Sequence, residues 1–215
     1  MNELFDFLIV LLILLNFRLL SSSRLIPCIR ILAMQAVLLT ALAWVTHSHQ
    51  MDLHLVIMLV INIIVKAGAL PWMLSRVTSK VEISRELDPI VGYTLSLMIG
   101  AALLGISFLI SRPLVLSHAG LENFFLPVSM FTVFSGLFII IARRKAVTQV
   151  LGYMVMENGI YAFGMAMAVN EPFIVELSVL LDLFVGVFIM GVAIFHISRE
   201  FDHIDTDRLS VLRDL

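Results

Sequence analysis

The sequence predicts an all-α membrane protein that crosses the bilayer about seven times. Of its 215 residues, 60% are hydrophobic and 14% are charged, and the mean hydropathy is +1.05. Soluble domains are about 25% charged, so this chain has too few charges for a soluble surface. The apolar residues form stretches of about 20, the length at which a helix crosses the hydrocarbon core. In lipid such stretches must be helical, because each backbone polar group needs a partner within its own segment.

Seven apolar segments are expected to span the membrane, and the chain between them has no room for a soluble domain. In order they are Leu4–Leu20, Leu25–Thr46, Leu53–Leu74, Pro89–Ile110, Phe124–Ala142, Val147–Val169 and Pro172–Ile197. The fourth and fifth carry no charge in their apolar interiors, which favours scaffold or lipid-facing helices. Pro71 is expected to kink or end the third segment. The domain organisation is therefore one transmembrane unit over residues 1–198 and a tail over residues 199–215.

The cationic residues predict the orientation. Twelve of the fourteen Lys and Arg residues lie in or near the connections after the first, third and fifth segments or in the tail: Arg18, Arg24, Arg30, Arg76, Lys80, Arg85, Arg143, Arg144, Lys145, Arg199, Arg208 and Arg213. The positive-inside rule makes that side cytoplasmic. With an odd number of spans, the N-terminus is expected outside and the C-terminal tail in the cytoplasm.

Composition also indicates which ligands to exclude. The single cysteine, Cys28, cannot form an internal disulfide or hold an iron–sulfur cluster, which needs about four ligands. The six histidines show neither HxxxH nor HExxH spacing. No basic patch with interleaved aromatic residues is present, so nucleic acid is not an expected partner. We expect no cofactor or metal in this chain.

Three ionisable residues are expected near the middle of the membrane. Glu157 lies about ten residues, or roughly 15 Å, into the sixth segment, and Asp182 lies equally deep in the seventh. Lys66 lies at mid-depth in the third segment, with Asn62 one turn away. An ionisable residue in hydrocarbon is a functional hypothesis by default. Two interpretations stay open for these residues: a proton relay, or a static ion pair that holds helices together.

Five further polar residues are secondary candidates. Tyr153 and Tyr161 lie one turn on either side of Glu157, where they can bond to it or pack. Asn158 is expected to bond across helices. Glu176 suits the membrane interface. His196 suits either proton entry or a side chain that extends its polar end to the membrane–water interface.

Asn16 and Gln35 are expected to be structural, because each is an isolated polar residue in an apolar segment.

A family resemblance rests on three stretches, RRKAVTQVLGYMVMENG, VLLDLFVGVFIMGV and DTDRLSVLRDL, together with NIIVKAGALP around Lys66. These stretches resemble component E of hydrogenase-4, a membrane subunit of group 4 [NiFe]-hydrogenase and formate hydrogenlyase complexes. The C-terminal three-helix portion, residues 124–198, is similar to the K subunit of respiratory complex I. In that subunit two intramembrane glutamates serve the proton pathway. Asp182 falls at the second of these positions and Met154 at the first, three residues before Glu157.

The resemblance implies a subunit of an oxidoreductase complex that is not catalytic on its own. The expected partners are antiporter-like and quinone-site-like membrane subunits and a cytoplasmic arm that carries the Ni–Fe and iron–sulfur centres. The expected location is the cytoplasmic membrane of a prokaryote. Two alternatives stay open at this point: a cation/proton antiporter subunit without a redox arm, and a purely structural membrane adaptor.

Overall fold

The computed structural model describes residues 2–22, 24–46, 53–80, 91–117, 124–143 and 146–167, together with Gly186 and Gly191. The described chain is helical and contains no strand. Its elements are α1 (Asn2–Leu20), α2 (Leu25–Thr46), α3 (Leu53–Asn62), η1 (Ile63–Ala69), α4 (Leu70–Lys80), α5 (Tyr93–Ser117), α6 (Phe125–Ala142) and α7 (Ala146–Met167). Apart from Gly186 and Gly191, the seventh predicted segment and the tail lie outside these residues.

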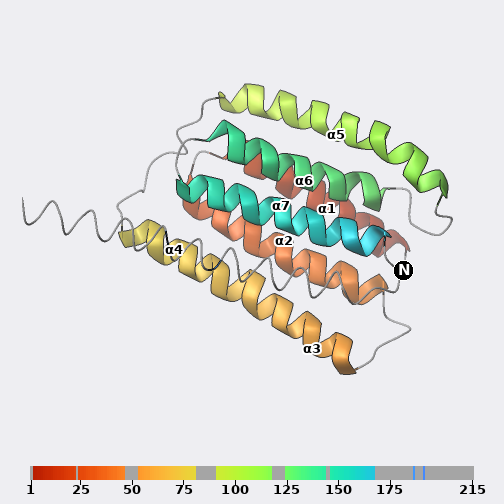
Figure 1. The fold of residues 1–215 in the computed structure, drawn as a ribbon, viewed down its shortest axis with the longest axis horizontal. Helices are drawn as coiled ribbons and strands as arrows, with labels where there is room; N and C mark the ends of the chain where they lie inside the picture. The colour runs from red at the N-terminus through yellow and green to blue at the C-terminus, as the bar shows by residue number, and fades with distance from the viewer. Residues whose placement is uncertain are drawn as a thin grey trace, which may run out of the picture.

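The helices lie side by side, as expected of a multi-pass membrane protein. Figure 1 shows α1, α2, α6 and α7 grouped together, with α5 along one side and the α3–η1–α4 rod along the other. Within the described residues, four stretches are long and apolar enough to cross a membrane: Leu25–Thr46, Leu59–Arg76, Tyr93–Pro113 and Phe125–Ala142. The all-helical, multi-pass class is therefore confirmed, whereas the number seven and the orientation of the termini stay predictions.

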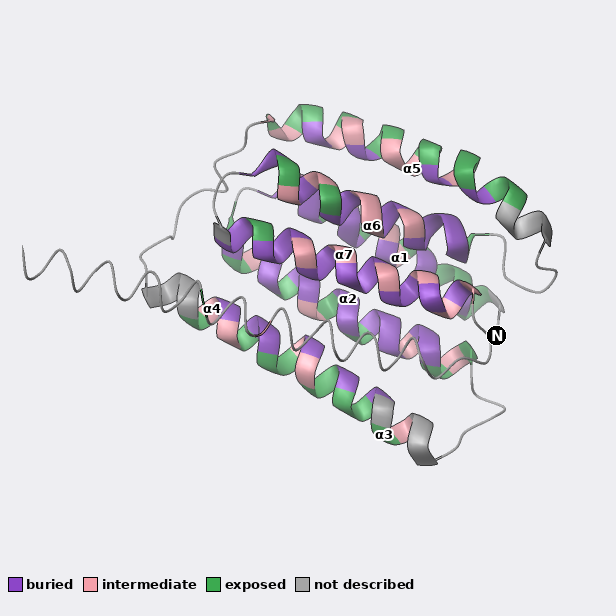
Figure 2. Ribbon diagram, viewed as in Figure 1, coloured by how far each residue is buried: buried purple, intermediate pink, exposed green. Residues whose placement is uncertain are grey.

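Burial separates the core helices from the outer ones (Figure 2). In α2 and α6, 61% of the apolar window is buried, but only 22% is buried in α5. The fourth predicted segment is thus a mostly exposed helix, as a lipid-facing helix should be. The fifth segment, which likewise lacks interior charges, forms α6 in the core. The sequence could not separate these two cases, because an apolar face suits lipid and protein neighbours equally well.

Glycines bring α6 and α7 into the most extensive helix–helix contact among the described elements. A Cβ on Gly136 would lie 2.6 Å from the Cα of Met156, and a Cβ on Gly152 would lie 2.9 Å from the backbone nitrogen of Ile140. A Cβ on Gly159 would meet the backbone of Val133. Small residues let two backbones approach closely, and the resulting van der Waals packing is one of the forces that hold helices together in lipid.

Pro71 does not end the third segment, so of the two alternatives expected for this residue only a kink stays open. The helix continues through α4 to Lys80. Proline lacks the N–H that an α-helix needs and clashes with the carbonyl four residues earlier. Here the preceding turns are wider than in an α-helix, because η1 is a π-helix and Leu70 donates its N–H to the carbonyl of Val65, five residues back. The wider turns accommodate Pro71 inside a continuous helical rod.

Candidate functional site

A buried ion pair joins the third predicted segment to the sixth. The Nζ atom of Lys66, in η1, lies 2.7 Å from Oε1 of Glu157, in α7. The two side chains are only 4% and 2% exposed. A charge buried in a low-dielectric interior is tolerated when it is paired with an opposite charge. The two mid-membrane groups that the sequence singled out in described helices are therefore direct partners.

An aromatic ring completes the surroundings of the lysine. Nζ of Lys66 lies 5.2 Å from the centre of the Tyr161 ring, a distance at which a cation is attracted to the ring face. Tyr161 is itself buried. Tyr153, one turn before Glu157 on α7, is partly exposed and interacts electrostatically with the Glu157 carboxylate. Both tyrosines thus lie around the pair, as their spacing predicted.

The π-helix determines where Lys66 points. A π-helix has more residues per turn than an α-helix, so it changes the rotational position of the residues within it. Within η1, Lys66 is buried, whereas Ile63, Ile64 and Gly68 are exposed. Asn62, the residue before η1, is also buried, on the lysine side. Such segments occur often at functional sites, so the geometry adds weight to Lys66 as a functional residue.

A second buried polar cluster lies among the core helices. Gln35 Nε2 donates to Asn16 Oδ1 at 3.0 Å, and Asn16 Nδ2 donates to Thr132 Oγ1 at 2.8 Å. All three side chains are fully buried. The bonds connect α2, α1 and α6, which agrees with the structural role expected of Asn16 and Gln35. Sequence reasoning missed Thr132, because a threonine in a membrane helix gives no signal of a partner in another helix.

Arg143 is a buried cation at the end of α6. Its Nη2 donates to the carbonyl of Leu20, the last residue of α1, at 3.5 Å, and its guanidinium lies 5.3 Å from the centre of the Tyr93 ring. Burial lowers the pKa of the Arg143 guanidinium, and Tyr93 and Cys28 act in the opposite direction. Arginine stays protonated in proteins, so this group holds a positive charge at the ends of two helices. The sequence indicated only its side of the membrane.

The remaining predicted candidates divide into two groups. Asp182, Glu176 and His196 lie outside the described residues. Asn158 is described and buried, but its Nδ2 has no hydrogen-bond partner in the described part of the chain, so the expected bond across helices is not found there. The described residues contain no group of three His, Cys, Asp or Glu side chains that could hold a metal ion.

Comparisons with known proteins give two matches. Residues 124–214 match the family described as NADH-ubiquinone/plastoquinone oxidoreductase chain 4L, so this region is of the complex I K-subunit type. A protein of Mycobacterium tuberculosis (strain ATCC 25618 / H37Rv) with the name "Uncharacterized protein Rv0085" is 32% identical over 187 residues, which cover 86% of this chain and 85% of that protein. No solved structure matches. The second match is about twice as long as the chain 4L region, so it also extends over residues outside that region.

Proposed function

Because this chain belongs to the family of the Mycobacterium tuberculosis protein Rv0085 and ends in a region of the chain 4L type, we propose that it is a membrane subunit of a redox complex related to respiratory complex I. We further propose that this complex is of the hydrogenase type, as the resemblance to hydrogenase-4 component E implies. Its neighbours are then antiporter-like and quinone-site-like membrane subunits and a cytoplasmic arm with Ni–Fe and iron–sulfur centres. Its location is the cytoplasmic membrane of a prokaryote.

The Lys66–Glu157 pair is the observation on which the proposed role depends. Glu157 belongs to the chain 4L-type region, whereas Lys66 belongs to the N-terminal part of the chain. A proton that moves onto Glu157 cancels the charge facing Lys66, and a proton that leaves Lys66 cancels the charge facing Glu157. The pair is thus a switch between charged and neutral states, which is the property a proton pathway through hydrocarbon needs.

Asp182 is the second carboxylate of this pathway. It precedes Gly186 by four residues in the sequence, which would be about one turn in the helix that its apolar segment predicts. Gly186 lies beside α4, since a Cβ there would be 3.8 Å from Cδ2 of Leu70, which follows Lys66 by four residues. These spacings support a pathway in which Lys66 exchanges protons with both Glu157 and Asp182.

The test is made on the complex purified from its native membrane. Nickel and iron in the co-purified complex, with hydrogen-linked redox activity, would support the hydrogenase type. A stable complex with neither metal would instead identify an antiporter subunit and would contradict the proposal.

Proton coupling is tested with Glu157→Gln, Asp182→Asn and Lys66→Met in the same complex, reconstituted into vesicles. Each is expected to lower proton transport per electron at least tenfold, the scale of a lost proton-transfer group. Glu3→Gln is the matched control, because Glu3 is an exposed carboxylate in the first turn of α1. If all three variants assemble and transport protons like the control, the subunit is a structural adaptor.

A further inference from the structure

Four polar side chains, one from each core helix, lie at one level of the bundle. They are Asn16 of α1, Gln35 of α2, Thr132 of α6 and Asn158 of α7, and none is more than 2% exposed. The hydrogen bonds from Gln35 to Asn16 and from Asn16 to Thr132 place three of them together. A Cβ on Gly159 would lie 2.9 Å from the carbonyl carbon of Thr132, which places the neighbouring Asn158 at the same level.

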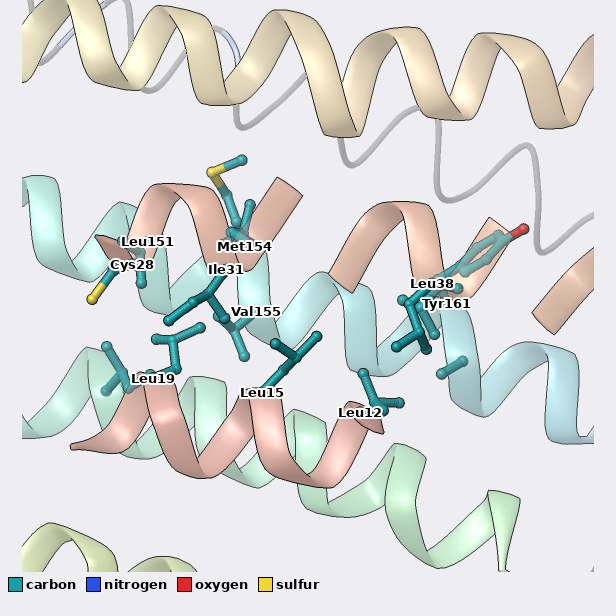
Figure 3. Close-up of a cluster of buried hydrophobic side chains, with 14 of the residues drawn as sticks. Leu12, Leu15, Leu19, Cys28, Ile31, Leu38, Leu151, Met154, Val155 and Tyr161 are labelled. Carbon is teal, nitrogen blue, oxygen red and sulfur yellow. The ribbon is translucent and has the colours of Figure 1, made fainter. Parts of the chain in front are cut away.

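The packing of α2 against α7 shows which residues of these two helices lie at the same level. In Figure 3, Cys28 and Leu151 lie toward one end of a single buried cluster, and Leu38 and Tyr161 lie toward its other end. Both pairs are 123 positions apart in the sequence, and Gln35 and Asn158 are separated by the same number. The two helices run in the same direction, so Gln35 and Asn158 occupy matching positions on the facing sides of α2 and α7.

The hydrogen bonds of this layer have a fixed direction. Thr132 donates its hydroxyl to the backbone carbonyl of Val128, which can only accept. The Thr132 oxygen therefore accepts from the Asn16 amide, and the Asn16 oxygen accepts from the Gln35 amide. The carbonyl oxygen of Gln35 remains at the end of the chain of bonds, where it requires a donor.

Apart from Glu157 Oε1, which forms the ion pair with Lys66, three buried atoms at or next to this level have no hydrogen-bond partner in the described part of the chain. They are Gln35 Oε1, Asn158 Nδ2 and Ser135 Oγ, which lies one turn of α6 from Thr132. One is an acceptor, one is a donor and the hydroxyl can be either. A water molecule needs two to four such partners, and a buried polar atom that is left without a partner destabilises the protein.

We propose that a buried water molecule is bound at this layer by Asn158, Gln35 and Ser135, and that it belongs to the proton pathway. It donates to Gln35 Oε1 and accepts from Asn158 Nδ2, and Ser135 supplies the third bond. Asn158 follows Glu157 directly on α7, so the water lies at nearly the same depth along the helix as the ion pair, although the two side chains leave α7 in different directions. This role, though not the water site itself, rests on the proposed function. It makes α1 and α2 part of the pathway rather than scaffold.

The experiment uses the intact complex and compares Asn158→Leu with Met154→Leu. Both positions lie on the same buried stripe of α7, but Met154 is apolar. In the wild-type complex, electron cryo-microscopy at a resolution that shows ordered water should find density within about 2.7–3.2 Å of Asn158 Nδ2 and Gln35 Oε1. Asn158→Leu should remove this density and lower proton transport per electron about tenfold. Met154→Leu should do neither.

Two results would overturn the proposal. One is a direct bond between the Asn158 and Gln35 amides with no water density in the wild-type complex. The other is normal proton transport in Asn158→Leu when the density has gone. Glu157→Gln separates this failure from failure of the proposed function. If Glu157→Gln loses proton transport while Asn158→Leu keeps it, only the proposed role of the water is wrong. If Glu157→Gln keeps proton transport, the proposed function is wrong, and the water density alone then decides whether the water site exists.

Discussion

At the scale of single residues, Lys66 and Glu157 stabilise each other in a place where neither is stable alone. The carboxylate oxygen and the amine nitrogen are 2.7 Å apart and shielded from solvent. Replacing both members of such a pair with neutral groups is often harmless, whereas removing one leaves an uncompensated charge. A static ion pair and a proton switch share this property, so stability and proton transport must be measured on the same variants.

We predict that Lys66→Met and Glu157→Gln each destabilise the protein by about 3–5 kcal/mol or force the remaining group into its neutral form. The double variant should recover most of that stability, because no unpaired charge remains. Thermal unfolding of the detergent-solubilised complex measures the effect.

The same double variant separates the two roles of the pair. A proton switch requires that the stable double variant still fails to couple proton transport to electron transfer. If the double variant is both stable and fully coupled, the pair has only a structural role.

At the scale of helices, close packing depends on where glycine stands rather than on how many glycines there are. Gly159 of α7 lies against the backbone of α6, and Gly136 of α6 lies against the backbone of α7. Gly105, on α5, has nothing within 4 Å of its Cβ direction. Of these three glycines, only Gly159 and Gly136 therefore require the absence of a side chain.

Gly159→Ala should destabilise the protein by roughly 1–3 kcal/mol, because the added methyl group meets backbone atoms that cannot move aside. Gly105→Ala is the control and should leave stability unchanged or slightly higher, since alanine favours a helix interior. Thermal unfolding of the two variants in one detergent gives the comparison. Equal stability of the two variants would mean that α6 and α7 are not in this close contact.

The sequence predicted where helices form better than it predicted which residues of different helices contact each other. The boundaries of α2 and α6 agree within one residue with the apolar segments that predicted them. The sequence missed the π-helix before Pro71, because an extra residue in a turn leaves no mark in hydrophobic patterning. It also missed Thr132 and the burial of Arg143, which depend on contacts between residues more than a hundred positions apart.

At the scale of the whole molecule, the distribution of basic residues predicts the orientation in the membrane. The apolar helices are compatible with either orientation. Basic residues follow the first, third and fifth apolar segments, which predicts an outside N-terminus. Cys28 is the only cysteine and is buried, so Cys28→Ser gives a background for labelling introduced cysteines.

In the Cys28→Ser background, a membrane-impermeant maleimide should label Ser48→Cys in intact cells. It should label Ser210→Cys only in inside-out vesicles, because the tail is expected in the cytoplasm. Labelling of both variants from the same side would contradict an odd number of spans. Labelling with the two sides exchanged would contradict the predicted orientation.

The sequence by itself determined that this is a helical membrane protein with Glu157 and Lys66 inside apolar segments, because hydropathy and charge are local properties of the chain. Only the tertiary structure decided that these two residues face each other, since a π-helix turns Lys66 inward and glycines hold α7 against α6. It also brought Asn16, Gln35, Thr132 and Asn158 to one level of the core. Pairing and register arise from packing between distant segments, and side-chain packing, unlike hydropathy, cannot be summed along a sequence.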